Sequence, residues 1–499
     1  MKLKLLALVC VAALGACSLD PVYQRPAAPV ATAWPTGSAY GTGAAVPSAA
    51  FAATGTASPL AAETGWRDFY KDARLQRLIA LALDNNRDLR VAALQVAQYE
   101  AQYRITRAAL GPSIDASGAL TNTRSDGTIS RSSSVSVGTT SWEIDFFGRL
   151  RSLKRQALEN YLSTDASRIS TQLALVATVA TDYLQWRADE AMLRIATDTV
   201  AADQRTYDLT VAMQKIGSAS LQDVREAQTS LAAAKASAAS YTRAVAQDRN
   251  DLAAAIGCAL PDDFDGGPTL LDSDAMFADI GAGLPSDLLM RRPDIVAAEH
   301  TLKAANANIG AARAAFFPKI ELTATAGTAS TSLSQLFKAG TGAWAFAPSI
   351  SLPIFDYGSN KASLDVAKIE KDIDVADYEK AIQTAFKEVS NALTGRETYV
   401  TQVYADREYV KSAQDYYDLA QARYRTGTDS FLTLLTAQRT LYTAQQQLVT
   451  DQLAKLSNLV TLYKVLGGGL QTSGKPSAVP AGEPVTADRG GAMPIEAMR

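Results

Sequence analysis

The stretch YDLTVAMQKIGSASLQDVREAQTSL, Tyr207–Leu231, recurs further along the chain as YDLAQARYRTGTDSFLTLLTAQRTL, Tyr417–Leu441. The offset is 210 residues throughout, so Gly217 in the first copy matches Gly427 in the second. In each copy a helical pattern stops at a short glycine-containing loop and then resumes, which predicts two helices joined by a tight turn at the glycine. Because a long internal repeat takes precedence over local patterns, we expect one structural unit made twice.

A second pair of matching segments extends the repeat toward the N-terminus. RAALGPSIDASG, Arg107–Gly118, matches RAAFFPKIELTATAG, Arg313–Gly327, with an offset of 206 residues. The change of offset from 206 to 210 means that the second copy gains four residues between Pro318 and Gly358. We therefore divide the chain into a first repeat at 63–260 and a second repeat at 261–470.

Each copy also contains stretches in which apolar and polar residues alternate. In KIELTATAGT, which starts at Lys319, isoleucine, leucine and alanine fall on one face while lysine, glutamate and threonine fall on the other. This period of two predicts β-hairpins at about 113–147 and 319–355. The alternation slips by one residue near Gly138 and Thr139, which predicts a bulge there.

The four predicted strands are long enough to cross a bilayer, which takes about ten residues when a strand is tilted. Four strands cannot close a membrane barrel, because the smallest have about eight, and an open strand edge is not tolerated in lipid. If these strands span a membrane, the barrel must be shared between chains. The alternative is a pair of surface hairpins on a soluble domain.

The rest of each copy is predicted to be helical over unusual lengths. Residues 149–216 contain neither proline nor glycine, and a continuous helix there would be about 100 Å long. The long helices are expected at 149–216, 219–257, 358–426 and 429–467. In the last of these, apolar side chains occupy eight of eleven positions of a heptad seam and glutamines the other three, which is typical of coiled-coil packing. A soluble helical bundle with the same seam is the alternative.

The N-terminus has the features of an export signal followed by a lipid anchor. Two lysines precede an apolar run that is too short to span a membrane, so we assign residues 1–16 to a signal peptide. The residues ending at Cys17 resemble the bacterial lipobox, in which the cysteine is acylated after cleavage; ordinary signal cleavage is the alternative. We expect residues 17–62 to form an extended tether that carries the lipid. We expect residues 471–499, which show no periodicity, to form a flexible tail.

Composition and motifs argue against catalysis and against nucleic-acid binding. A net charge of -3 with 20% charged residues gives no basic surplus. The sequence has no GxSxG, Walker-type or HExxH pattern, and its only histidine, His300, lacks a cysteine partner for metal binding. The acidic run that starts at Pro261 lacks the remaining ligands of a calcium loop and is expected to be a turn.

Cys258 is the one free thiol expected in the mature chain. We predict no enzymatic activity, cofactor or metal.

Together these features resemble one family. The matching segments are CSLDPVYQRP from Cys17, LPSDLLMRRPDIVAAEHTL from Leu284 and YRTGTDSFLTLLTAQRTLYTAQQQL from Tyr424. With the duplicated hairpin and long-helix unit, they are similar to the outer-membrane efflux protein family (TolC-like), in particular to its lipoprotein branch of OprM-like, NodT-type outer-membrane factors. The resemblance covers nearly all of the chain from Cys17 to Gly469.

The resemblance implies an α+β membrane protein that is internally duplicated and forms a homotrimer. Four transmembrane strands per chain would give a twelve-stranded barrel in the outer membrane, continuing into a periplasmic α-helical coiled-coil barrel. The implied function is the exit duct of a tripartite efflux pump, with a periplasmic adaptor and an inner-membrane transporter of the resistance-nodulation-division (RND) class. The alternatives are a periplasmic coiled-coil scaffold lipoprotein and the duct of a type I protein secretion system. The sequence does not specify the cargo.

The resemblance also places a gate at the tips of the long helices, near Gly217 and Gly427. The family's gate positions fall on Leu432, Thr436, Arg439, Arg423, Tyr424, Asp223 and Glu226. Leu432 is expected in an apolar ring, and Arg423 and Tyr424 are expected to face the two acidic residues of the first copy. Thr436 stands where the family usually has an aspartate, which puts an acidic, cation-selective ring at that level in doubt.

Overall fold

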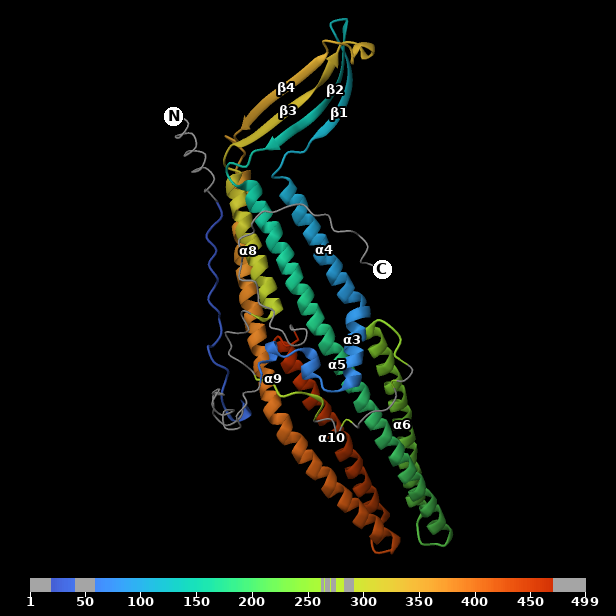
Figure 1. Ribbon diagram of the computed structural model, residues 1–499. Coiled ribbons are helices and arrows are strands. Elements are labelled where there is room, and N and C mark those ends of the chain that lie inside the picture. The colour runs from blue at the N-terminus through green and yellow to red at the C-terminus, as the bar shows by residue number, and fades with distance from the viewer. Residues whose placement is uncertain are drawn as a thin grey trace.

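The computed structural model describes residues 19–40, 59–261, 264, 270, 275–281 and 291–469. The molecule is elongated, with a β-sheet at one end of a long column of helices (Figure 1). The expected signal peptide, Cys17 and the expected tail lie outside the described residues.

The helices follow the order expected from the duplication. In the first repeat they are α2 (Trp66–Phe69), α3 (Ala73–Asn85), α4 (Arg87–Ala108), α5 (Arg149–Lys215) and α6 (Leu221–Ile256), and in the second repeat α8 (Pro293–Ala314), α9 (Ser359–Arg425) and α10 (Phe431–Val465). Short 3-10 helices are η1 (Ser38–Tyr40), η3 (Ala61–Glu63) and η5 (Leu333–Gln335). The four longest helices begin and end within two residues of the stretches expected from the sequence.

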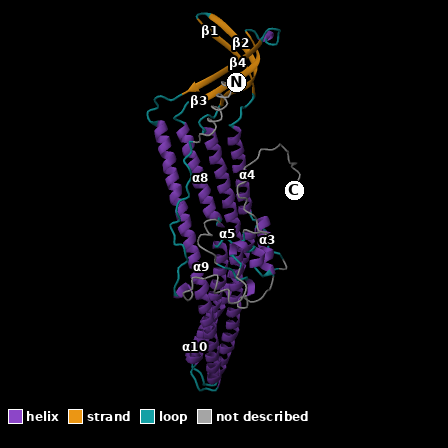
Figure 2. Cartoon of the chain, turned by 60° about the vertical axis from the view of Figure 1, so that its left-hand side comes forward, coloured by secondary structure: helices purple, strands orange, loops and turns teal. Residues whose placement is uncertain are grey.

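Two helical hairpins form the lower part of the column. Helices α5 and α9 have 67 residues each, which corresponds to about 100 Å. Helix α6 folds back along α5 and α10 folds back along α9, and α5 also packs against α4, α8 and α10. Both hairpin turns lie at the end of the column away from the sheet (Figures 1 and 2). No helix in the described part of the chain is both long and apolar enough to cross a membrane.

The largest hydrophobic core lies at mid-height, where α3 and the short N-terminal elements pack on the long helices. We call it the waist core. Its centre is Tyr463, whose ring stacks on Phe69 with 3.9 Å between centroids and whose hydroxyl donates a 2.7 Å hydrogen bond to the carbonyl oxygen of Thr64. Tyr70 and Trp186 are also almost fully buried in this core. Aromatic packing of this kind fixes the short N-terminal elements to α10 at the waist.

The sheet is antiparallel with the strand order β1-β2-β3-β4. The strands are β1 (Asp115–Ser125), β2 (Thr128–Glu143), β3 (Lys319–Ser330) and β4 (Gly342–Ser351). A two-residue turn, Asp126 and Gly127 with φ of 47° and 80°, joins β1 to β2, as expected for a tight hairpin. The β3–β4 connection is longer and contains η5. It lies within the stretch where the sequence predicts the four extra residues.

The two faces of the sheet differ in polarity. Val137, Ala326 and Trp344 lie opposite one another on neighbouring strands and so share one face. On the other face the hydroxyls of Ser117 and Ser136 are 3.0 Å apart.

The pairing of β2 with β3 shifts register between Thr139 and Trp142, where Ser141 has a φ of 55°. The bulge predicted near Gly138 is confirmed. It returns the alternation to phase, so Trp142 lies opposite Leu322 on the apolar face.

Candidate functional site

The candidate site is the pair of hairpin tips, where each long helix turns into its partner. Gly217 and Gly427 have φ of 80° and 72°, a left-handed conformation that glycine adopts without a steric penalty. Ser220 caps α6 in a capping box with Asp223, and Ser430 caps α10. The repeat therefore encodes two turns of the same construction.

The α9–α10 tip is closed by an ion pair across its turn. Nε and Nη2 of Arg423 donate to the two carboxylate oxygens of Asp429 at 2.7 and 3.1 Å. The guanidinium holds the pKa of Asp429 below its usual value. The Arg423 side chain remains 57% exposed, so it stays accessible at the very end of the molecule.

A small apolar cluster joins the two tips, and we call it the tip cluster. Its buried members are Ala227, Tyr424, Phe431, Leu434 and Leu435. The rings of Tyr424 and Phe431 are 5.7 Å apart at 59°. Since Ala227 belongs to α6 and the other members belong to α9 and α10, the cluster ties the first repeat to the second.

A buried hydrogen bond lies a short distance above this cluster. Nε2 of Gln438 on α10 donates to Oδ1 of Asp203 on α5 at 2.5 Å, and the two residues are only 7% and 6% exposed. Burial raises the pKa of Asp203, although Gln438 and the positive charge of Arg439 act in the opposite direction. We call this contact the α5–α10 joint. It connects the two hairpins through a carboxyl group that has little access to water.

The structure separates the sequence-derived gate candidates into buried and exposed side chains. Tyr424 is buried in the tip cluster, whereas Leu432 is 61% exposed. Thr436 and Arg439 are exposed, and the Thr436 hydroxyl donates back to the carbonyl oxygen of Leu432. Glu226 is half-buried.

The single chain does not bring Arg423 to Asp223. Arg423 pairs with Asp429, while Asp223 accepts from the backbone of Ser220 in the helix cap. The apolar ring at Leu432 and the contacts of Arg423 and Tyr424 with the acidic residues stay predictions.

Carboxyl groups also face one another across each hairpin, far above the tips. On α10, Asp451 faces Asp406 of α9; burial and this neighbour raise the pKa of Asp406 to about 6. On α6, burial and Asp189 of α5 raise the pKa of Asp248 to about 7. A neighbouring carboxylate disfavours the ionised form of a carboxyl group, so Asp406 and Asp248 keep their protons to a higher pH than usual. We therefore expect the packing of both hairpins to depend on pH.

The remaining residues singled out in the sequence, His300, Cys258 and the acidic run that starts at Pro261, show no metal-binding arrangement in the described part of the chain. Nδ1 of His300 on α8 lies 2.6 Å from Oε2 of Glu159 on α5, and Cys258 is a half-buried free thiol. Within the described ranges, no group of three or more histidine, cysteine or acidic side chains is arranged to hold a metal ion. Most of the acidic run that starts at Pro261 lies outside these ranges.

The duplicated chain, with an antiparallel sheet of one apolar and one polar face on a column of helical hairpins, has the architecture of outer-membrane channel proteins. The chain belongs to the outer membrane efflux protein family, whose profile matches residues 78–258 and 284–468. It is thus an outer-membrane efflux protein of the α+β, duplicated kind, with its sheet in the outer membrane and its helices in the periplasm.

Relatives and solved structures resemble the chain over nearly its whole length. The antibiotic efflux pump outer membrane protein ArpC and the toluene efflux pump outer membrane protein TtgC, both of Pseudomonas putida, are each 50% identical to it over 464 residues, covering 91% of this chain and 93% of each relative. The crystal structure of the open state of the MtrE outer membrane channel of Neisseria gonorrhoeae superposes with a TM-score of 0.81 at 39% identity, covering 91% of this chain and 99% of that one.

Proposed function

We propose that the chain is the passive exit duct of a tripartite efflux pump, assembled as a homotrimer that docks to a periplasmic adaptor and an inner-membrane RND transporter. The observation that carries the proposal is the open four-stranded sheet. Its outer strands, β1 and β4, each pair with only one neighbour among the described residues. The transporter would supply the energy, and the duct would have no catalytic role.

Open sheet edges require further strands. A backbone N–H or C=O group left unpaired in the hydrocarbon region costs several kcal/mol, so only closed barrels are stable there. The β1 edge of one copy would pair with the β4 edge of the next, and three copies of four strands would close a twelve-stranded barrel. The exposed apolar side chains of β4, with Trp344 at 80% and Phe346 at 63% exposure, suit a lipid-facing surface.

The helical column offers matching surfaces for neighbouring copies. Helices α4 and α9 lie at opposite edges of the column (Figure 2). Each of them exposes large apolar side chains. These residues are Val91, Leu94 and Ile105 on α4, and Val366, Ile369 and Ile373 on α9. Apolar stripes at helical spacing favour burial against another helix. In a trimer, α4 of one copy would cover α9 of the next.

The relatives suggest apolar or amphiphilic cargo. One of the two Pseudomonas putida relatives is named for antibiotics and the other for toluene, so we propose that this duct passes unrelated small molecules selected by its transporter. We also propose acylation at Cys17, which would hold the N-terminus at the membrane surface.

The test is complementation of a strain that lacks its own outer-membrane efflux ducts. The strain would express this chain together with a compatible adaptor and RND transporter, and resistance to antibiotics, dyes, detergents and toluene would be measured. Restored resistance to several unrelated compounds supports the proposal. The control is the same strain with an inactive transporter, which should remain sensitive because the duct alone supplies no energy.

Two outcomes would contradict the proposal. A protein that stays monomeric and leaves membranes without detergent once its lipid is removed would be a scaffold lipoprotein. Restored export of a protein substrate, without any change in drug resistance, would instead indicate a type I secretion duct.

A further inference from the structure

The first described residues form an extended strap along the outside of the helical column. This strap, residues 19–34, runs beside α8 and α9 from the sheet end toward the waist (Figure 1). Tyr23 and Val30 pack against the apolar cluster that α8 and α9 form. Trp34 stacks on Phe386 of α9 with 5.1 Å between ring centroids. The strap is therefore packed against the column at several points along its length.

A buried carboxylate fixes the middle of the strap. Glu299 of α8 is 5% exposed and accepts from Nε and Nη2 of Arg25 at 3.1 and 2.7 Å. Lys303 lies 3.1 Å from the same carboxylate. Burial opposes ionisation of Glu299, but the bonds from Arg25 and Lys303 outweigh burial and lower its pKa. The strap thus supplies part of the charge that keeps this group ionised.

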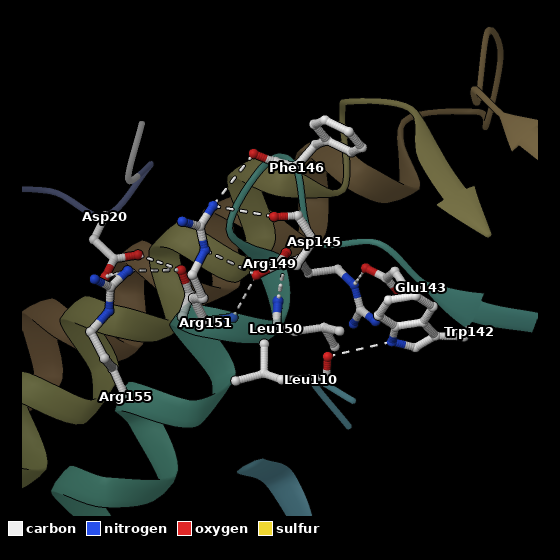
Figure 3. Close-up of polar contacts among 11 residues, drawn as sticks. Asp20, Leu110, Trp142, Glu143, Asp145, Phe146, Arg149, Leu150, Arg151 and Arg155 are labelled. Atoms are coloured by element: carbon white, nitrogen blue, oxygen red, sulfur yellow. Dashed lines mark hydrogen bonds and ion pairs between the residues drawn. The ribbon is translucent and has the colours of Figure 1, made fainter. Parts of the chain in front are cut away.

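At the upper end of the strap, the side chain of Asp20 makes direct polar contacts with α5. Oγ of Ser152 donates to Oδ1 of Asp20 at 2.5 Å, and Nη2 of Arg155 lies 2.5 Å from Oδ2 (Figure 3). Ser152 is completely buried, and a buried hydroxyl is costly unless it is hydrogen-bonded. The strap therefore provides the acceptor that this serine on α5 requires.

Helix α8 completes the binding site with a notch. A Cβ atom on Gly310 would overlap Oδ1 of Asp20 and would also crowd Ser152, so only glycine leaves room for the carboxylate. On either side of Asp20, Nη1 of Arg313 donates to the carbonyl oxygen of Leu19 at 3.0 Å and Nδ2 of Asn306 donates to that of Pro21 at 2.8 Å. We call Ser152, Arg155 and Gly310 the Asp20 seat.

The seat lies where the sheet meets the helices. Figure 3 shows Arg155 one turn along α5 from Arg151, which bonds Asp145 in the connection that follows β2. Nearby, Nε1 of Trp142 donates to the carbonyl oxygen of Leu110 at the end of α4. The seat is therefore at the level of the strand bases, the edge of the proposed membrane-spanning region.

We propose that Asp20 is the positioning residue for the lipid-bearing N-terminus. The proposal rests on the acylation of Cys17 put forward above. Cys17 precedes Asp20 by three residues, so chain connectivity limits their Cα separation to at most about 11 Å. Seating Asp20 thus holds the acyl group beside the strand bases and couples the anchor to α5 and α8. The lipid then fixes the height of the duct in the membrane.

The experiment measures hydrogen exchange of the strap in the full-length, membrane-extracted protein. Gly310→Ala should block the notch, although alanine is the better helix former by about 1 kcal/mol. We expect the amides of residues 19–25 to exchange at least tenfold faster, with no change in the sheet. Gly111→Ala is the control, because a Cβ at Gly111 makes only an ordinary contact.

A second variant keeps the proposal testable if Gly310→Ala perturbs α8. Asp20→Ala should speed exchange of the strap to a similar degree. The double variant should stay close to Asp20→Ala alone, because the severe overlap with Oδ1 disappears with the carboxylate and only the milder crowding of Ser152 remains. Acylated protein whose strap exchanges at the wild-type rate in both single variants would overturn the seat. The intact mass reports acylation separately, and unacylated wild-type protein would overturn the anchor even with the strap protected.

Discussion

Replacing Gln438 with leucine is expected to weaken the α5–α10 joint. The substitution removes the 2.5 Å hydrogen bond to Asp203 and leaves a carboxylate that is 6% exposed without that donor. A hydrogen bond to a charged group contributes about 1.5–3 kcal/mol. A loss of about 2 kcal/mol corresponds to roughly thirtyfold more of the loosened joint at equilibrium.

The assay is hydrogen exchange at the tips, with single-channel conductance as the functional readout. Amides at the end of α5 and the start of α10 should exchange about thirtyfold faster, and the channel should spend more time in its open state. Gln445→Leu is the matched control: Gln445 lies one heptad further along α10, is half-buried, and has no side-chain hydrogen bond among the described residues. It should leave both readouts near wild type.

The pH dependence of the Gln438→Leu defect tests whether the Asp203 carboxyl group causes it. Burial already raises the pKa of Asp203, and removing Gln438 removes an opposing contribution, so this pKa should rise further. For a carboxyl whose folded-state pKa is raised, stability is highest at low pH and falls as pH rises through that pKa. The defect should thus be smaller at pH 5 than at pH 8, and Asp203→Asn should abolish the difference. An equal defect at both pH values, or an equal effect of Gln445→Leu, would refute the reasoning.

Three further outcomes are expected. Because the pKa of Asp406 is raised to about 6 by burial and by Asp451, α9–α10 packing should loosen as pH rises from 5 to 7, measured by hydrogen exchange, and Asp406→Asn should not respond. Tyr463→Ala should remove the stack on Phe69 and lower the free energy of unfolding by about 3–5 kcal/mol, measured by denaturant titration; a loss below 1 kcal/mol would contradict the importance of the waist core. Thr436→Asp should increase cation selectivity in planar bilayers, and unchanged reversal potentials would exclude this position from the conduction path.

The sequence predicts the fold well because its signals are long and repeated. An offset of 210 residues with glycines at equivalent turns defines two hairpins without any tertiary information. The bulge in β2 was also predictable, since a one-residue slip in the alternation of polar and apolar residues is visible in the sequence itself. Helix α9 is also predicted, although it contains Gly395, a residue that lowers helix propensity. The structure supplies the reason: Asn458 of α10 approaches so closely that a Cβ at Gly395 would overlap its side chain.

The joint and the seat were not predicted because each depends on residues far apart in the chain. Asp203 and Gln438 are separated by 235 positions, and Asp20 and Ser152 by 132. One signal did exist for the joint. Gln438 interrupts an apolar heptad seam, and a polar residue at such a position usually has a specific partner. No pattern in α5 identifies Asp203 as that partner.

The distribution of buried surface indicates where the column can move. The waist core is large and rich in stacked aromatic rings, whereas the tip cluster has only five buried members. Full burial of one large apolar side chain contributes about 1.5–3 kcal/mol, so the joint, at about 2 kcal/mol, is comparable to one member of the tip cluster but minor beside the waist. Any force that separates the hairpins will therefore open the tips first, while the waist and the sheet above it keep their packing.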